Sequence, residues 1–257
     1  MAEFGLIGNP VSHSKSPALF HAAYGKGKGS YELIEEQSCK EAMNRFLKGE
    51  YRGINVTAPF KEQVMEYVTD PDRVSSILGS ANVLLKDRNY LENGKIYSYN
   101  TDYYGVKNSL KGLLSPEVGA VTVVGAGGAG KAAALAMADG GLKVFMANRS
   151  AERALPFAEK RGMKYVELRN LAEAVEQSQL LIYSLSMAVE GLRGLKLEDK
   201  IVFEANYAAP NLSPECGVRS LRYIRGEYWL YNQAIPAFEL FTGSRPDLAA
   251  MRRVAGI

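Results

Sequence analysis

An apolar run followed at once by a glycine-rich loop constrains the fold of this chain most strongly. Residues 120–124 read AVTVV, which predicts a strand buried on both faces of a sheet. Residues 125–134 read GAGGAGKAAA, a glycine turn that leads into an alanine-rich helix. Strand, turn and helix in this order are typical of nucleotide-binding α/β sheets, because the helix N-terminus attracts phosphate. We therefore expect an α/β fold with parallel strands.

The glycine-rich loop fits two phosphate-binding patterns. Gly125-x-Gly127-x-x-Gly130 is typical of dinucleotide-binding domains, whereas Gly125-x-x-x-x-Gly130-Lys131 is typical of the P-loop of phosphotransferases. A P-loop requires a Ser or Thr after the lysine to hold magnesium, and this chain has Ala132. Because the metal would lose that ligand, a dinucleotide is favoured. A purely structural glycine turn is the third alternative.

The end of the next predicted strand indicates which dinucleotide is expected. An acidic residue about 20 residues after the loop begins would hold the ribose of NAD, but residues 143–150 read KVFMANRS, without a carboxylate. Arg149 stands there, and Arg153 follows one helical turn later. A guanidinium can bind a ribose 2′-phosphate through two charge-assisted hydrogen bonds. We therefore favour NADP as the cofactor over the alternative that both arginines are merely solvated. The predicted cofactor-binding residues are Gly125, Ala126, Gly127, Gly128, Ala129, Asn148, Arg149, Ser150 and Arg153.

Composition argues against several other classes of protein. The chain has 257 residues, of which 47% are hydrophobic and 23% charged, and its net charge of +3 is spread without a basic stripe for nucleic acid. Cys39 and Cys216 form no paired motif and no metal-ligand set with the two histidines. The N-terminus lacks a signal-peptide pattern, and no run reaches the ~18 apolar residues of a membrane span. A cytoplasmic protein with no metal, nucleic-acid or membrane partner is expected.

Strand and helix patterns alternate along the chain, which favours parallel strands joined by helices. A helix N-cap is expected at Ser16, a two-residue hairpin turn at Asn93-Gly94, and a C-terminal helix from Gln233 with Pro236 in its first turn. A domain boundary is expected near residues 100–118. The predicted strands are residues 4–7, 31–34, 53–56, 81–86, 96–99, 120–124, 144–147, 180–183 and 201–204.

Polar stretches lie at the ends of predicted strands in the first hundred residues, where ligands of open α/β sheets bind. Each has an ordinary explanation by itself, as a helix cap or a solvated charge. Their occurrence together ahead of a dinucleotide loop favours a substrate site. The stretches are residues 12–17 (SHSKSP), 55–61 (NVTAPFK), 80–82 (SAN) and 100–102 (NTD).

These motifs, in this order, resemble those of the shikimate dehydrogenase family. The match covers nearly the whole chain. GNPVSHSKSP (residues 8–17) is similar to the family's opening substrate motif, GINVTAPFK (53–61) to its lysine motif and NTDYYG (100–105) to its aspartate motif. GAGGAG and the later NRS resemble its cofactor motifs, and YNQA (231–234) with AFELFTG (237–243) resembles its closing glutamine helix.

The resemblance implies a two-domain enzyme with its active site in the cleft between the domains. Residues 1–102, joined by the C-terminal helix 233–257, would form an α/β substrate-binding and catalytic domain, and residues 103–232 a Rossmann-type NADP-binding domain. The implied reaction is the reversible NADPH-dependent reduction of 3-dehydroshikimate to shikimate, in the biosynthesis of chorismate and the aromatic amino acids. The implied partners are these small molecules, and the protein would be a monomer or homodimer.

The resemblance also implies roles for individual residues. Lys61 and Asp102 would be the catalytic pair, with Ser14 and Ser16 on the substrate carboxylate. Oxidation of an alcohol releases a proton from oxygen, and Lys61 would either transfer it or stabilise the alkoxide; His13 is an alternative base. The implied substrate-binding residues are Ser14, Ser16, Asn55, Thr57, Asn82, Tyr207 and Gln233.

The chain departs from the family pattern at three places. Val83 stands where the family commonly has Thr, residues 184–187 (SLSM) replace an Asn-Ala-Thr-type segment, and the Asp-x-x-Tyr-x-Pro pattern reads EANYAAP at residues 204–210. Two alternatives therefore stay open. One is a relative that accepts quinate or uses NAD; the other is a non-catalytic NADP- or shikimate-binding regulator, against which the retained Lys61 and Asp102 argue.

Overall fold

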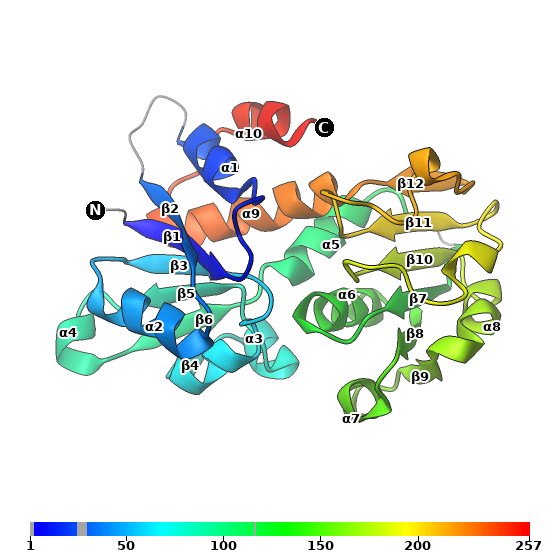
Figure 1. Cartoon of the computed structure of the whole chain (residues 1–257), viewed down its shortest axis with the longest axis horizontal. Helices are drawn as coiled ribbons and strands as arrows, with labels where there is room; N and C mark the ends of the chain where they lie inside the picture. The colour runs from blue at the N-terminus through cyan, green and yellow to red at the C-terminus, as the bar shows by residue number, and fades with distance from the viewer. Residues whose placement is uncertain (1–2, 25–29, 116) are drawn as a thin grey trace. The chain divides into compact units, whose positions relative to one another are not determined.

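A computed structural model describes residues 3–24, 30–115 and 117–257, which divide into two units, each with its own six-stranded sheet (Figure 1). Unit 1 comprises residues 1–104 and 231–257, and unit 2 comprises residues 105–230. The C-terminal segment thus returns to the N-terminal unit. The predicted α/β fold class, including this return, is confirmed.

The sheet of unit 1 is mixed, and one reversed strand defines where the site residues meet. Strand β5 runs antiparallel to its neighbours β3 and β6, whereas the other pairings are parallel. Residues that precede β5 therefore share a sheet edge with residues that follow β3 and β6. The strands, in the order β2-β1-β3-β5-β6-β4, are β2 Tyr31–Glu35, β1 Phe4–Gly8, β3 Gly53–Val56, β5 Val83–Lys86, β6 Ile96–Tyr99 and β4 Asp70–Pro71.

Helices cover both faces of this sheet. On one face, α2 buries Met43 and Phe46 against Ile54 of β3. On the other, Phe4 of β1 stacks on Phe241 of α9, with ring centroids 4.9 Å apart, and each such buried side chain contributes about 1.5–3 kcal/mol. This aromatic packing holds the C-terminal segment on unit 1. The helical elements are α1 Ser16–Ala23, α2 Cys39–Lys48, the 3₁₀ turn Gln63–Tyr67, α3 Arg73–Leu78, α4 Tyr90–Asn93, α9 Gly226–Thr242 and α10 Leu248–Ala255.

Two local predictions in unit 1 were wrong. Ser16 is the first residue of α1 and Lys15 its N-cap, since Lys15 already has helical dihedral angles; the Ser16 backbone N–H donates to the Ser14 hydroxyl. Asn93-Gly94 is no hairpin turn: α4 ends at Asn93, and Gly94 caps it in the left-handed conformation, with φ of +63°. Left-handed glycine suits both a hairpin turn and a helix end, so the dipeptide alone does not distinguish them.

The C-terminal helix α9 begins at Gly226, seven residues before the predicted start. Pro236 consequently lies inside the helix and not in its first turn. Residues 226–230 belong to unit 2, where Trp229 packs on Phe203 of β11 with ring centroids 5.4 Å apart. This packing extends the helix beyond the segment that local sequence preferences indicate.

The sheet of unit 2 is entirely parallel and has the Rossmann strand order. Its first strand, β7, is buried along its whole length, as predicted. The order reverses beside β7, which pairs with β8 on one side and β10 on the other, so the glycine loop lies at the switch point where dinucleotides bind. The strands, in the order β12-β11-β10-β7-β8-β9, are β12 Arg222–Ile224, β11 Ile201–Glu204, β10 Leu180–Tyr183, β7 Ala120–Val124, β8 Lys143–Asn148 and β9 Lys164–Glu167.

Helices also cover both faces of the second sheet. Four alanines of α6 are buried, Ala132, Ala133, Ala134 and Ala136, which lets the helix lie close to the strands. Helix α8 buries Leu171 and Val175 with Leu181 of β10. The helices are α5 Asp102–Leu110, which begins in unit 1, α6 Gly128–Asp139, α7 Ala151–Lys160 and α8 Leu171–Glu176, with 3₁₀ turns at Leu168–Asn170, Leu192–Gly194 and Pro214–Cys216. Within the described part of the chain, no helix has the length and apolar character needed to span a membrane.

Candidate active site

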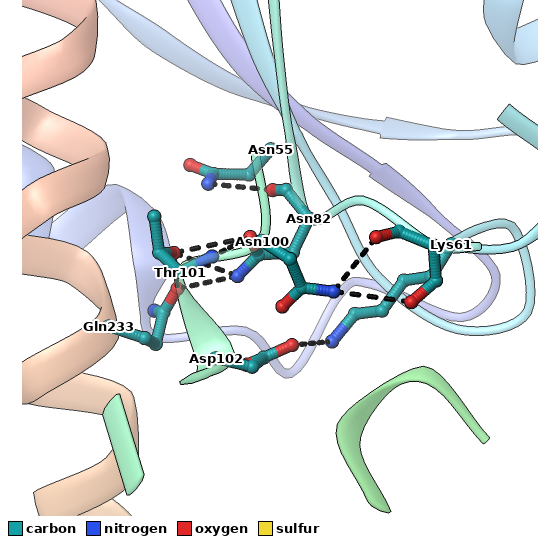
Figure 2. A network of polar contacts seen from close by, with 8 residues as sticks. Asn55, Lys61, Asn82, Asn100, Thr101, Asp102 and Gln233 are labelled. Carbon is teal, nitrogen blue, oxygen red and sulfur yellow. Dashed lines mark hydrogen bonds and ion pairs between the residues drawn. The ribbon is translucent and has the colours of Figure 1, made fainter. Parts of the chain in front are cut away.

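A lysine and an aspartate from two different strand ends form an ion pair in unit 1. Lys61 Nζ donates to Asp102 Oδ2 over 2.6 Å (Figure 2). The side chains are only 17% and 7% exposed. Lys61 follows β3, in a loop held by the bond from the Ala81 backbone N–H to the Lys61 carbonyl oxygen, and Asp102 begins α5 directly after β6. A short charge-assisted contact with so little solvent is suited to holding a proton beside a bound alcohol.

Three further predicted residues meet beside this pair. The Asn82 side chain accepts a hydrogen bond from the Thr101 backbone N–H at 2.7 Å and donates to Thr101 Oγ1 at 2.9 Å and to Gln233 Oε1 at 3.2 Å. Asn55 Nδ2 donates to the Asn82 carbonyl oxygen at 3.1 Å. Gln233 belongs to α9, so the network joins the first hundred residues of the chain to its C-terminal segment (Figure 2).

The predicted serines lie where the loop after β1 enters α1: Ser14 in the loop and Ser16 at the first position of the helix. Ser14 Oγ donates to Ser16 Oγ at 3.1 Å, and the Val11 backbone N–H, which donates to the Glu35 carboxylate at 2.8 Å, anchors the loop. Thr57 follows β3, and its backbone N–H donates to the Ile7 carbonyl oxygen at 2.9 Å. His13 is exposed in the same loop.

The structure adds residues that the sequence did not single out. Tyr31 on β2 donates its hydroxyl to Asn55 Oδ1 at 2.8 Å, and no pattern distinguishes it from an ordinary strand tyrosine. Thr101 lies inside the recognised NTD motif, which was the available signal for it. Asn100 in the same motif is fully buried, and its side chain donates to the Ser80 carbonyl oxygen at 3.0 Å. It ties the end of β6 to the segment before β5.

The glycine loop in unit 2 has the geometry of a phosphate cradle. Gly125 has φ of +110°, which favours glycine, and a side chain on Gly130 would overlap the backbone of Gly125. A Cβ at Gly127, by contrast, would meet no atom within 4 Å. Helix α6 begins at Gly128 without a side-chain cap, so its first N–H groups can bind an anion. This donor set fits the pyrophosphate of a dinucleotide.

The other predicted cofactor residues lie at the same edge of the sheet, because β8 pairs with β7. Asn148 ends β8; its side chain donates to the Ser150 carbonyl oxygen at 2.9 Å, and its own carbonyl oxygen accepts from the Tyr165 hydroxyl at 3.2 Å. Arg149 and Arg153 are exposed. Two cationic side chains beside a phosphate cradle fit an additional phosphate on the ribose.

Residues 184–187, where the chain departs from the family pattern, contact the glycine loop. Ser184 Oγ donates to the Val124 carbonyl oxygen at 2.7 Å, and a side chain on Gly125 would overlap the Ser184 hydroxyl. The Tyr183 hydroxyl donates to the Met187 carbonyl oxygen at 2.6 Å. Burial raises the pKa of Tyr183 to about 12, which keeps this donor protonated. Ser184 thus packs against Gly125 and is held there by its hydrogen bond to Val124.

The acidic residue at the end of β11 organises the next loop. Glu204 is fully buried, and its carboxylate accepts from the Asn211 backbone N–H at 2.5 Å, the Leu212 backbone N–H at 2.9 Å and the Tyr223 hydroxyl at 3.0 Å. Burial raises the pKa of Tyr223, and the neighbouring Glu204 raises it further. The loop closed in this way carries Tyr207, which belongs to unit 2, whereas the other predicted substrate residues belong to unit 1.

Two family models match the chain. "Shikimate dehydrogenase substrate binding domain" matches residues 6–84, and "Shikimate / quinate 5-dehydrogenase" matches residues 111–198. Both the substrate-side motifs and the cofactor loop therefore lie in matched segments.

Similar proteins cover nearly the whole chain. Shikimate dehydrogenase (NADP(+)) of Archaeoglobus fulgidus is 35% identical over 99% of this chain and 98% of its own length, and that of Natronomonas pharaonis is 34% identical over 98% and 97%. Shikimate 5-dehydrogenase of Thermus thermophilus, solved in complex with NADP(H) and shikimate, superposes with a TM-score of 0.81 at 28% identity, covering 100% of this chain and 99% of that one.

Proposed function

The chain belongs to the shikimate dehydrogenase family, and we propose that it catalyses the reversible NADPH-dependent reduction of 3-dehydroshikimate to shikimate. The observation that carries this proposal is the ion pair between Lys61 Nζ and Asp102 Oδ2, at 2.6 Å. A protein that only binds shikimate has no need of a part-buried lysine–carboxylate pair beside a set of hydrogen-bonding amides. The pair therefore favours an enzyme over a regulator.

The two units bind different ligands. Unit 1 holds the substrate, with Ser14 and Ser16 on the carboxylate and Asn55, Asn82 and Gln233 on the ring hydroxyls. Thr57 follows β3 at the same edge of the sheet, where its hydroxyl would contact the substrate. Tyr207, from unit 2, would add a substrate contact of its own.

Unit 2 holds the cofactor. The residues from Gly125 to Ala129 would bind the pyrophosphate, and Asn148, Arg149, Ser150 and Arg153 the adenosine ribose and its 2′-phosphate. When bound, NADP exchanges hydride with the substrate carbon. The donor chemistry of these residues fits a phosphorylated dinucleotide better than NAD, because no carboxylate follows β8.

Lys61 acts on the substrate oxygen. During reduction, an ammonium at Nζ either donates a proton to the developing alkoxide or stabilises its negative charge. Asp102 keeps the ammonium in place by accepting a hydrogen bond from one of its three N–H groups. Each role requires the lysine at the reacting oxygen, and they differ in whether another cation can replace it.

An oxidation assay tests this function. Purified protein is mixed with shikimate and NADP, and the absorbance of the reduced nicotinamide is followed. Parallel reactions contain NAD in place of NADP, or quinate in place of shikimate. Fast reduction of NADP with shikimate is expected; binding of both ligands without reduction would instead identify a regulator.

We also propose an oligomeric state and a cellular location, both expected from the sequence. The protein is a monomer or homodimer, which sedimentation at several concentrations distinguishes. It works in the cytoplasm, where fractionation of the source cells should find it.

A further inference from the structure

We propose that Tyr31 is a positioning residue of the substrate site, whose buried hydroxyl fixes the side chain of Asn55. The inference rests on the proposed function, since Asn55 acts there as a substrate ligand. Tyr31 lies outside the motifs that identify the family.

The donors and acceptors around Asn55 fix the direction of each hydrogen bond. The Asn82 carbonyl oxygen can only accept, so the group that faces it at 3.1 Å is the Asn55 amide nitrogen. The amide oxygen of Asn55 consequently faces the Tyr31 hydroxyl at 2.8 Å. Because that oxygen only accepts, Tyr31 donates its single proton to Asn55.

The surroundings of Tyr31 keep its hydroxyl a permanent donor. The residue is 7% exposed, and its ring packs on Phe20 with centroids 4.7 Å apart. Burial raises the pKa of the phenol above its ordinary value. Tyr31 thus stays protonated at any pH at which an enzyme is assayed, and its effect on Asn55 is independent of pH.

Tyr31 also shares a cavity with the proposed substrate ligands. A narrow cavity in unit 1 has Ser16, Tyr31, Asn55 and Gln233 as its polar lining. Three of these four residues are proposed substrate ligands. Tyr31 hydrogen-bonds one of them, Asn55, and restricts the rotation of its amide before the substrate arrives. Pre-ordering of this kind lowers the entropic cost of binding.

Tyr31→Phe tests the proposal, with Tyr24→Phe as the matched control. Tyr24 belongs to the same aromatic cluster and packs on Phe20 and Phe238 with centroids 5.1 Å away in each case. The loss of one hydrogen bond predicts that Tyr31→Phe raises the KM for shikimate about five- to twenty-fold. The kcat, the KM for NADP and the shape of the pH profile should stay within about twofold, as should every parameter of Tyr24→Phe.

A double-mutant cycle tests whether Tyr31 acts through Asn55. Asn55→Ala removes the acceptor, so adding Tyr31→Phe to it should change the KM for shikimate by less than about twofold. Independent, multiplicative effects of the two substitutions would overturn the proposal. An unchanged KM in Tyr31→Phe would do the same.

A donor-preserving side chain supplies the rescue. p-Aminophenylalanine at position 31 keeps the ring and an N–H donor, so its KM for shikimate should lie within about threefold of wild type. It also provides the comparison if Tyr31→Phe does not fold. A KM as high as that of Asn55→Ala would contradict the positioning role.

The wild-type assay distinguishes a failure of the proposed function from a failure of the role of Tyr31. If the unmodified protein does not oxidise shikimate with NADP, the proposed function fails. If it does, and Tyr31→Phe matches wild type, only the role of Tyr31 fails.

Discussion

Lys61 Nζ lies 2.6 Å from Asp102 Oδ2, although 41 positions separate the two residues in the chain. Lys61 follows β3 and Asp102 follows β6, and the antiparallel β5 between these strands lets both end at one edge of the sheet. Solvent screens the pair only weakly, because both side chains are mostly buried.

Removal of the Lys61 ammonium should impair turnover far more than binding. Lys61→Ala is expected to lower kcat by about 10²- to 10⁴-fold, the usual contribution of a positioned acid–base group, with a much smaller change in KM. Steady-state kinetics measure both, and Lys95→Ala, at an exposed lysine, is the control. A wild-type kcat in Lys61→Ala would remove the role assigned to this residue.

Lys61→Arg distinguishes the two roles left open for the lysine. An arginine keeps the positive charge but does not give up its proton at neutral pH. If Lys61 acts only by electrostatic stabilisation, Lys61→Arg should keep a substantial part of the activity that Lys61→Ala loses. Equal losses in the two variants would point to proton transfer.

Arg149 should determine the preference for the phosphorylated cofactor. Arg149→Ala is expected to raise the KM for NADP about 10- to 100-fold, because a charge-assisted contact to phosphate is lost, while the KM for NAD changes little. Arg169→Ala, at another exposed arginine of unit 2, is the control. Equal losses with both cofactors would contradict a contact to the 2′-phosphate.

Two glycines of the loop should respond differently to alanine. Gly130→Ala places a methyl group against the Gly125 backbone and should destabilise unit 2 by about 1–3 kcal/mol. Gly127→Ala meets no protein atom within 4 Å and has an extended backbone that alanine adopts, so it should fold normally but bind NADP weakly. Thermal melting and cofactor titration test the pair; a stable Gly130→Ala would contradict the close approach.

Glu204 should stabilise unit 2 through its buried carboxylate. In Glu204→Gln, one acceptor oxygen becomes an N–H₂ donor that must face the donors of Asn211, Leu212 or Tyr223. We expect a loss of about 1–3 kcal/mol in the free energy of unfolding, measured by urea denaturation. The exposed Glu198, as Glu198→Gln, should be neutral, and a neutral Glu204→Gln would show that the loop closes without the carboxylate.

The two cysteines should differ in reactivity. Cys216 is exposed, whereas burial raises the pKa of Cys39 to about 11, with a further contribution from Glu66. Only the thiolate reacts, so the folded protein should label rapidly at Cys216 near pH 8, and Cys39 only after unfolding. Cys216→Ser should abolish the fast phase seen with a chromogenic disulfide reagent; fast labelling of Cys39 would contradict its burial.

Local signals in the sequence were sufficient for the strand, turn and helix with which the sheet of unit 2 begins, although they did not predict its edge strands β9 and β12. The run AVTVV and the glycines that follow it specify a buried strand, a tight turn and a helix start through contiguous residues. Patterns without such local constraint were read less well. Asn93-Gly94 predicted a hairpin turn but ends a helix, and the start of α9 depends on the packing of Trp229 against Phe203.

The sequence by itself therefore determined the fold class, the family and the strand, turn and helix of the glycine loop, because each is carried by short motifs of contiguous residues. Only the tertiary structure decided which side chains touch. The reversed strand β5 brings Asn82 to the edge that carries Asn55 and Thr101, and helix α9 delivers Gln233 to the same place. The contact of Tyr31 with Asn55 also emerged only from the tertiary structure, because a hydrogen bond from β2 to β3 depends on strand pairing and not on any local motif.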